Sequence, residues 1–221
     1  MPTVRYDGLA EWYDNEFAQD GPGRRTVIDF LGDGPGSLID VGCGTGAHTA
    51  AFAARGWEVV GVDIAEELLA RARERGVEVV TADAAALPFA DASFDAAVSM
   101  WTHTDVDDFD AVLGEVRRVL RPDGRLVYLG AHPSFVGPHS LFVGAEGVPQ
   151  LHAGLYRLAG RYSEAPGVSP TGLRARVGAT HLPLGVFIQA FVDAGFTLER
   201  IAEPEADERD FPYMLALRFR R

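Results

Sequence analysis

The sequence has no lysine and only one cysteine among its 221 residues. With Cys43 alone, no disulfide can form within the chain. This cysteine content fits a reducing compartment, so we expect a cytoplasmic protein. All 20 basic residues are arginine, and 32 acidic residues leave a net charge of −12. That balance argues against nucleic acid as a partner, because binding to phosphates needs clustered positive charge.

Long apolar runs are also missing. No stretch approaches the roughly 20 residues that a membrane-spanning helix needs, so we expect no membrane partner. The N-terminal segment is interrupted by acidic residues such as Asp7, Glu11, Asp14 and Glu16, which is unlike a secretory signal. The hydrophobic content of 47% and the length of 221 residues are sufficient for one α/β domain, which we place at 1–221.

The most informative stretch is a glycine-rich turn between an expected strand and an expected helix. Residues 37–41 are mostly apolar, as in a parallel strand buried on both faces. Gly42, Gly44 and Gly46 follow at alternate positions, and 47–55 is compatible with a helix. Glycine tolerates positive φ and lets a ligand approach the backbone. A strand, a tight turn and a helix N-terminus in this order predict a site for the polar end of a small ligand.

The rest of the chain continues the alternation of strands and helices. The patterns predict further strands at 58–63, 77–82, 94–100, 125–129, 197–203 and 211–219, and helices at 25–31, 66–75, 107–121 and 183–194. The turn at 204–210 is short, so it joins the last two strands in antiparallel fashion. The sequence therefore predicts an α/β protein whose sheet is mostly parallel.

The glycine spacing narrows the choice of ligand. The dinucleotide fingerprint is G-x-G-x-x-G, whereas this chain has Asp40 followed by G-x-G-x-G. The motif resembles the first motif of class I S-adenosylmethionine (SAM) dependent methyltransferases that act on small molecules. Four other segments are similar to the same family, namely YDGLAEWYD at 6–14, LPFADASFD at 87–95, EVRRVLRPDGRLV at 115–127 and HLPLGVFIQAFVDAGF at 181–196.

This resemblance implies a fold and a reaction. The fold would be a Rossmann-like, doubly wound sheet of seven mostly parallel strands with an antiparallel last strand and helices on both faces. A lid helix would lie within 1–20. The resemblance leaves out residues 131–180. The prolines and glycines of 131–182 break the pattern after the fifth strand, and we expect a substrate cap there, with a helix at 151–162. The cofactor would be SAM, leaving S-adenosylhomocysteine (SAH). The acceptor would be a small molecule, such as a secondary metabolite or a quinone-like precursor, and we expect O- or N-methylation.

Acidic residues at two strand ends are expected to hold the nucleoside. Asp63 can accept hydrogen bonds from both ribose hydroxyls, a geometry that nucleotide-binding and SAM-binding sheets share. Alternatively, it caps the helix at 66–75. The resemblance implies that Asp83 accepts from the adenine amino group, as a carboxylate can, while the Ala84 N–H binds a ring nitrogen. Ile64 would then lie against one face of adenine.

The remaining cofactor residues come from the glycine loop, the fourth strand and the lid. Around the loop and after the fourth strand, the resemblance implies contacts from Asp40, Gly42, Gly44, Gly46, Met100 and Trp101. The rings of Tyr6 and Tyr13 would face the sulfonium, since a π face attracts a cation. The segment around these tyrosines can instead be an ordinary amphipathic helix packed on the core, and Trp101 can simply cover the core.

Three histidines are candidate general bases, in the order His103, His132 and His181. His103 comes first because ligands of open α/β sheets bind at the carboxyl ends of strands. It could also hold substrate or cap the next helix. A positioned base adds about 10²–10⁴-fold to a rate, although an acidic acceptor can react without one. Four of the six histidines fall in 131–182 at spacings that match no tight metal motif, so no metal is expected.

Two other functions compete with methyl transfer. A nicotinamide-dependent oxidoreductase would need a different glycine spacing and a second domain for its substrate. A SAM-binding protein of the same fold, with a regulatory or non-methylating role, is compatible with the motifs because fold does not fix function. The oligomeric state, monomer or homodimer, stays open.

Overall fold

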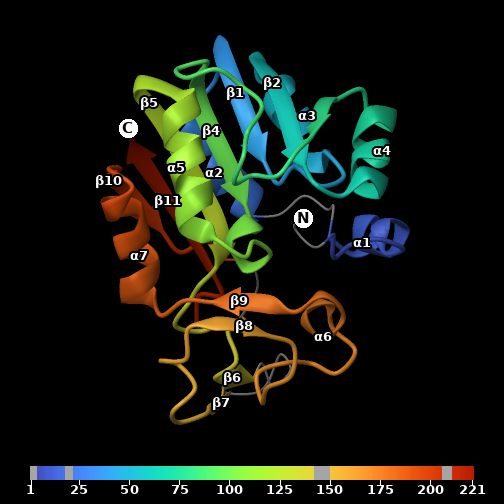
Figure 1. Cartoon of the computed structure of the whole chain (residues 1–221), viewed down its shortest axis with the longest axis vertical. Helices are drawn as coiled ribbons and strands as arrows, with labels where there is room; N and C mark the ends of the chain where they lie inside the picture. Colours follow the sequence, from blue (N-terminus) through green and yellow to red (C-terminus); the bar gives the residue numbers. More distant parts are fainter. Residues whose placement is uncertain (1–3, 18–21, 142–149, 206–210) are drawn as a thin grey trace.

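A computed structural model describes residues 4–17, 22–141, 150–205 and 211–221. Its main sheet consists of β1 (Gly36–Val41), β2 (Trp57–Asp63), β3 (Glu78–Thr81), β4 (Phe94–Met100), β5 (Leu120–Ala131), β10 (Thr197–Ala202) and β11 (Met214–Arg220). The strands pair in the order β10-β11-β5-β4-β1-β2-β3. Neighbouring strands are parallel except that β11 runs antiparallel to both β5 and β10. The predicted seven-stranded fold with a reversed last strand is therefore confirmed (Figure 1).

The structure has seven α-helices in its described residues. They are α1 (Ala10–Phe17), α2 (Pro22–Leu31), α3 (Ala47–Ala53), α4 (Glu66–Glu74), α5 (Phe109–Val119), α6 (Leu173–Val177) and α7 (Leu184–Asp193). Of these, α2 and α3 cover one face of the sheet and α5 and α7 the other, while α1 and α6 lie away from both faces (Figure 1). Side chains alternate across each strand, so Ile39 joins the core under α5 and α7, while Leu38 joins the core under α2 and α3. The apolar stripe of α5 explains its place, since Val112 and Val116 are buried against the sheet.

Two segment predictions need correction. The helix predicted at 107–121 ends at Val119, because Leu120 already has the extended conformation that begins β5. The helix predicted at 151–162 is wrong. That region contains β7 (Gln150–Leu151), a turn and β8 (Gly160–Tyr162). Its two glycines, Gly154 at φ +84° and Gly160 at φ +121°, lie outside the helical region and interrupt any helix there.

The inserted segment forms two small ribbons at one edge of the main sheet. β6 (Ser140–Leu141) pairs with β7, and β8 pairs with β9 (Ala179–His181). Figure 1 shows that β1, β2 and β4 point their carboxyl ends toward this segment, and that α1 lies beside the same edge. Parts of the expected insertion and acidic turn, 142–149 and 206–210, lie outside the described residues, as do 1–3 and 18–21 of the lid region. Within the described ranges, no helix is both long and apolar enough to cross a membrane.

Candidate active site

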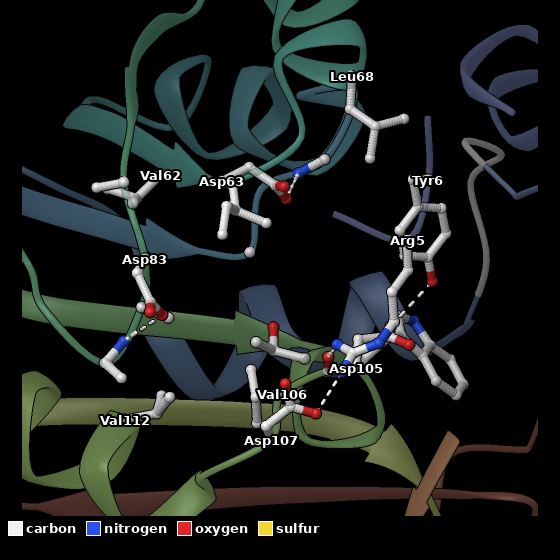
Figure 2. A pocket seen from close by; sticks show the side chains of 18 of the residues that line it. Arg5, Tyr6, Val62, Asp63, Leu68, Asp83, Asp105, Val106, Asp107 and Val112 are labelled. Carbon is white, nitrogen blue, oxygen red and sulfur yellow. Dashed lines mark hydrogen bonds and ion pairs between the residues drawn. The ribbon is translucent and has the colours of Figure 1, made fainter. Parts of the chain in front are cut away.

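Two adjoining cavities open at the carboxyl edge of the sheet. The smaller has a volume of about 190 Å³ and lies among Asp63, Asp83 and the lid (Figure 2). The larger has a volume of about 450 Å³ and reaches from the glycine loop to the inserted segment. This volume falls in the range of about 300–1,000 Å³ that small-molecule sites occupy. The two cavities share Tyr6, Tyr13, Gly42, Gly44, Met100, Trp101 and Asp105.

The glycine loop is fixed to the end of β2. The N–H groups of Gly42 and Cys43 donate to the carbonyl oxygen of Val62 at 2.7 and 3.0 Å. Gly44 has a φ of +53°, and a Cβ there would meet nothing closer than Tyr13 Cε1 at 3.9 Å, so its open side faces both cavities. A bound molecule can therefore approach the backbone closely at this position.

Gly46 has a different environment from the other two loop glycines. It lines neither cavity, and a Cβ on it would lie 2.8 Å from the Cβ of Ala72 on α4. The structure therefore brings Gly46 against a neighbouring helix, although the sequence places it among the cofactor residues. Its φ of +73° and this close packing both require glycine.

Asp63 ties the glycine loop to the segment after β2. Its Oδ2 accepts from the Gly44 N–H at 2.9 Å and its Oδ1 accepts from the Ala65 N–H at 2.9 Å. Burial raises the pKa of this carboxyl, while the hydrogen bonds from Ala65, Gly44 and Ile64 act in the opposite direction. The N-cap of α4 is Ala65, so Asp63 is not itself the capping residue. Its carboxyl group instead lines the smaller cavity.

The wall opposite Asp63 combines one acidic group with apolar side chains. Asp83 follows β3, and its Oδ1 accepts from the Ala85 N–H at 2.9 Å. Ala84 and Ile64 also line the smaller cavity, together with Val106 from the segment after β4. A slot with apolar faces and a carboxyl group at each end suits a flat base joined to a ribose, which needs acceptors for its amino and hydroxyl groups.

Asp40 lies deeper, beside the larger cavity. Its side chain is 2% exposed, and its Oδ2 accepts from the Thr49 hydroxyl at 2.6 Å. Burial raises its pKa to about 7, with the Asp63 carboxylate adding to the effect and the Thr49 hydrogen bond opposing it. The group is therefore partly protonated near neutral pH.

The end of β4 is held in a strained conformation at the junction of the cavities. Trp101 has a φ of +66°, which is rare for a bulky residue and marks functional sites. Its N–H donates to the carbonyl oxygen of Leu129 at 2.7 Å, and the Thr102 hydroxyl donates to the carbonyl oxygen of Val41 at 2.9 Å. These bonds aim Met100 and Trp101 into both cavities. The expectation that Trp101 lies at the site, and not only over the core, agrees with this placement.

The lid supplies the expected aromatic groups. The rings of Tyr6 and Tyr13 meet edge to face with centroids 5.2 Å apart, and both line both cavities. Burial raises the pKa of each tyrosine, with the Asp105 carboxylate adding to the effect, so both hydroxyls stay protonated at neutral pH. Two π faces beside a shared space suit a cationic centre such as a sulfonium.

None of the three candidate histidines lines either cavity. His103 is 3% exposed and lies between Phe109 and Phe187, where its Nδ1 bonds the hydroxyl of Tyr128. Burial lowers its pKa to about 3, so it stays neutral and is a weak base. A general-base role for His103 stays a prediction that this placement does not support.

The other two histidines contact other groups. His132 Nε2 pairs with Glu203 at 3.0 Å, and burial lowers the pKa of His132 despite that carboxylate. His181 Nε2 donates to the Tyr156 carbonyl oxygen at 2.8 Å. Both roles remain predictions, and neither ring is near the space that the cavities share.

The sequence did not reveal an ion pair at the junction of the cavities. Asp105 lines both cavities, and its Oδ1 accepts from Arg174 Nη1 at 3.1 Å. Its Oδ2 accepts from the Tyr6 hydroxyl at 2.9 Å. Asp105 could have been suspected from its place five residues after β4 ends at Met100. Arg174, on α6 of the inserted segment, carries no signal in the sequence.

The fold and this site together have the features expected of a class I SAM-dependent methyltransferase. The open face of Gly44, the slot between Asp63 and Asp83, and the lid tyrosines fit the parts of SAM, and eleven of the twelve expected cofactor residues line a cavity. Residues 39–128 match the methyltransferase domain family.

Named relatives act on quinones. The demethylmenaquinone methyltransferase of Mycobacterium sp. strain KMS is 40% identical over 128 residues, covering 55% of this chain and 56% of that protein. A ubiquinone/menaquinone biosynthesis C-methyltransferase of Desulfotalea psychrophila is 35% identical over 162 residues, covering 66% of this chain and 65% of that protein. The chain thus spans just over half the length of the Mycobacterium protein.

A solved structure shows the same fold along nearly the whole chain. The SAM-dependent methyltransferase of Mesorhizobium loti superposes with a TM-score of 0.73 at 24% identity, covering 97% of this chain and 99% of that one. The matched family and the name of this structure support SAM as the cofactor, in agreement with the prediction.

Proposed function

We propose that this chain transfers the methyl group of SAM to a ring carbon of a small quinol, the reduced form of a quinone. The observation that carries the proposal is the shared wall of the two cavities. A nucleoside in the smaller cavity and an acceptor in the larger one would meet beside Met100, Trp101 and Asp105, which belong to both. The names of the relatives supply the acceptor class.

The sulfonium of SAM supplies an electrophilic methyl group, so the chain's own contribution is mainly positional. The lid tyrosines cover the shared space and exclude water, while Gly44 and Asp63 fix the depth of the nucleoside. Holding two reactants in line can lower a barrier by about 7–11 kcal/mol in favourable cases.

A carbon acceptor replaces the sequence-based preference for oxygen or nitrogen. One relative is named a C-methyltransferase, and both relatives are named for quinones. The larger cavity supports an apolar ring, because Ala131, Val136 and Leu173 line it together with the aromatic Tyr213. A quinol ring is electron-rich and can use a ring carbon as the nucleophile, whereas the oxidised quinone cannot.

The test is an acceptor screen with purified protein and SAM that carries a labelled methyl group. We expect SAH to form with dihydroxynaphthalenes that lack the ring methyl, only in their reduced form. Nuclear magnetic resonance of the product should show the label on carbon. A label on oxygen would refute carbon methylation. Tight SAM binding without SAH formation from any acceptor would refute the enzyme and favour the SAM-binding alternative.

A further inference from the structure

We propose that Asp105 removes the proton of the acceptor's hydroxyl group and that Arg174 holds the oxyanion that results. The proposal rests on the function proposed above, and it assigns a role to the inserted segment, which delivers Arg174. It concerns acceptors with an acidic hydroxyl, such as quinols and other phenols.

The position of Asp105 is the first argument. A group that deprotonates the acceptor must lie where the acceptor meets the methyl donor. Asp105 satisfies this condition, because it follows β4 and lines both cavities. Of the other groups that could accept a proton, His48 and Asp40 line only the larger cavity. The remaining carboxyl groups line only the smaller one, namely Asp63, Asp83, Asp107 and Asp108. His103, His132 and His181 line neither.

The contacts of Asp105 form the second argument. One oxygen accepts from Arg174 at 3.1 Å and the other from the Tyr6 hydroxyl at 2.9 Å, and both charged side chains are largely buried, at 23% and 22% exposure. Arg174 is the only arginine among the described residues that line the larger cavity. The remaining wall toward the insertion is apolar apart from the hydroxyl group of Tyr213, so the Asp105–Arg174 pair is the charged partner that an acceptor hydroxyl finds there.

The charges balance in the proposed step. The O–H bond of the acceptor breaks, its electron pair stays on oxygen, and the proton moves to an Oδ atom of Asp105. The negative charge therefore passes from the carboxylate to the acceptor oxygen, and the Arg174 guanidinium faces it before and after. Because the buried cluster keeps the same total charge, the step creates no new buried charge, which would be costly.

The surroundings make Asp105 a better base than an exposed carboxylate. Burial raises its pKa, although Arg174 and the Tyr6 hydrogen bond act in the opposite direction. Other ionisable groups that interact with it come from the lid, the insertion, the end of β2 and β5, namely Arg5, Tyr13, Arg161, Tyr162, Asp63 and Tyr128. A raised pKa brings the carboxylate closer to the acidity of a phenol and favours proton transfer.

The first experiment reports on ionisation and not on turnover. It uses 4-nitrophenol, whose anion is yellow, bound to the SAH-loaded protein and titrated with pH. Asp105→Asn removes a negative neighbour, so the probe should ionise at a pH lower by at least about 1 unit, while Arg174→Gln should move it about as far upward. Glu199→Gln is the matched control, because it changes an ion pair of 3.0 Å with Arg218 that lines neither cavity.

The proposal is supported if the pH at which bound nitrophenol ionises shifts in opposite directions in the two variants and does not shift in the control. No shift, shifts of the same sign, or failure of nitrophenol to bind would overturn it. This result does not depend on which acceptor is methylated. It therefore remains informative if the screen for quinol methylation fails.

The second experiment measures kinetics with the best acceptor from that screen. Asp105→Asn should lower kcat by about 10²–10⁴-fold and leave the KM for SAM within a few-fold. The acidic limb of the wild-type pH profile should disappear in this variant. Arg174→Lys should recover part of the rate that Arg174→Gln loses, because a cation is restored. A loss confined to SAM binding, or a full loss of rate in His48→Gln with normal turnover in Asp105→Asn, would overturn the proposal.

Discussion

Replacing Asp63 by alanine should greatly weaken cofactor binding. The carboxylate holds two backbone N–H groups at 2.9 Å each, those of Gly44 and Ala65. Without it the loop loses its tie to the start of α4, and each buried donor left unpaired costs about 1–3 kcal/mol. The ribose hydroxyls lose charge-assisted partners worth about 1.5–3 kcal/mol each. The unpaired N–H groups destabilise the free and the bound protein alike, so part of that energy cancels in the binding equilibrium. We therefore expect a net loss of about 3 kcal/mol in the free energy of cofactor binding, roughly 150-fold in Kd.

The assay is calorimetric titration with SAM and SAH, accompanied by thermal unfolding to verify that the variant is folded. Asp29→Ala is the control, because Asp29 also pairs with an arginine, Arg200 at 2.8 Å, but is 65% exposed. An exposed ion pair contributes about 0–1 kcal/mol to stability. Asp29 lines neither cavity, so the Asp29→Ala variant should bind SAM and SAH with the affinity of the wild type. A folded Asp63→Ala protein whose Kd lies within three-fold, roughly 0.7 kcal/mol, of the wild-type value would refute this reasoning.

Three further changes test the packing and electrostatics. Burial raises the pKa of Asp40 to about 7, so the folded chain holds a proton that the unfolded chain releases above its own pKa near 4, and the free energy of unfolding falls as pH rises between these values. Asp40→Asn removes this contribution, so urea titrations at pH 5 and 7.5 should show the variant gaining up to about 2.5 kcal/mol on the wild type at the higher pH; equal differences at both pH values would contradict it. Gly76→Ala, with φ +75° and nothing within 4 Å of the new Cβ, should lower the free energy of unfolding by about 1–2 kcal/mol. Gly46→Ala has a similar φ of +73° but also a contact of 2.8 Å, and should lower it by about 1–3 kcal/mol more. Equal denaturant midpoints for the two variants would show that the protein relieves this contact. His103→Ala should lower the free energy of unfolding by about 2–4 kcal/mol, because it opens a void among aromatic rings and unpairs Tyr128, while calorimetry should show unchanged SAM affinity; full stability with lost turnover would instead restore this histidine as a base.

The sequence predicted the sheet and the cofactor side of the site because these depend on local patterns. The glycine spacing after Asp40 and the acidic residues that follow two strands are local signals, and parallel strands bring their carboxyl ends to one edge. The single reversed strand followed from a short turn. The predicted elements agree with the structure from β1 to β5 to within two residues at each end, except that β5 begins at Leu120 and not at Arg125.

The acceptor side could not be predicted in the same way. The ribbons of the insertion contain strands of two or three residues, which are too short to show periodicity and are stabilised by pairing with distant residues. Arg174 reaches Asp105 across 69 positions of sequence, so no spacing reveals the pair. His103 was misleading because its neighbour in sequence, Trp101, turns toward the cavities through its positive φ, whereas His103 turns into the core among Phe109 and Phe187.

The path of the chain separates the recognition of donor and acceptor. The described part of the segment between β5 and α7 adds no strand to the seven-stranded sheet, yet it carries Arg174 and Leu173 to the larger cavity. Mutations accumulating there would leave strand register and the nucleoside slot untouched. We expect chimaeras that exchange residues 131–183 between homologues to inherit the acceptor of the donated segment and the SAM affinity of the host.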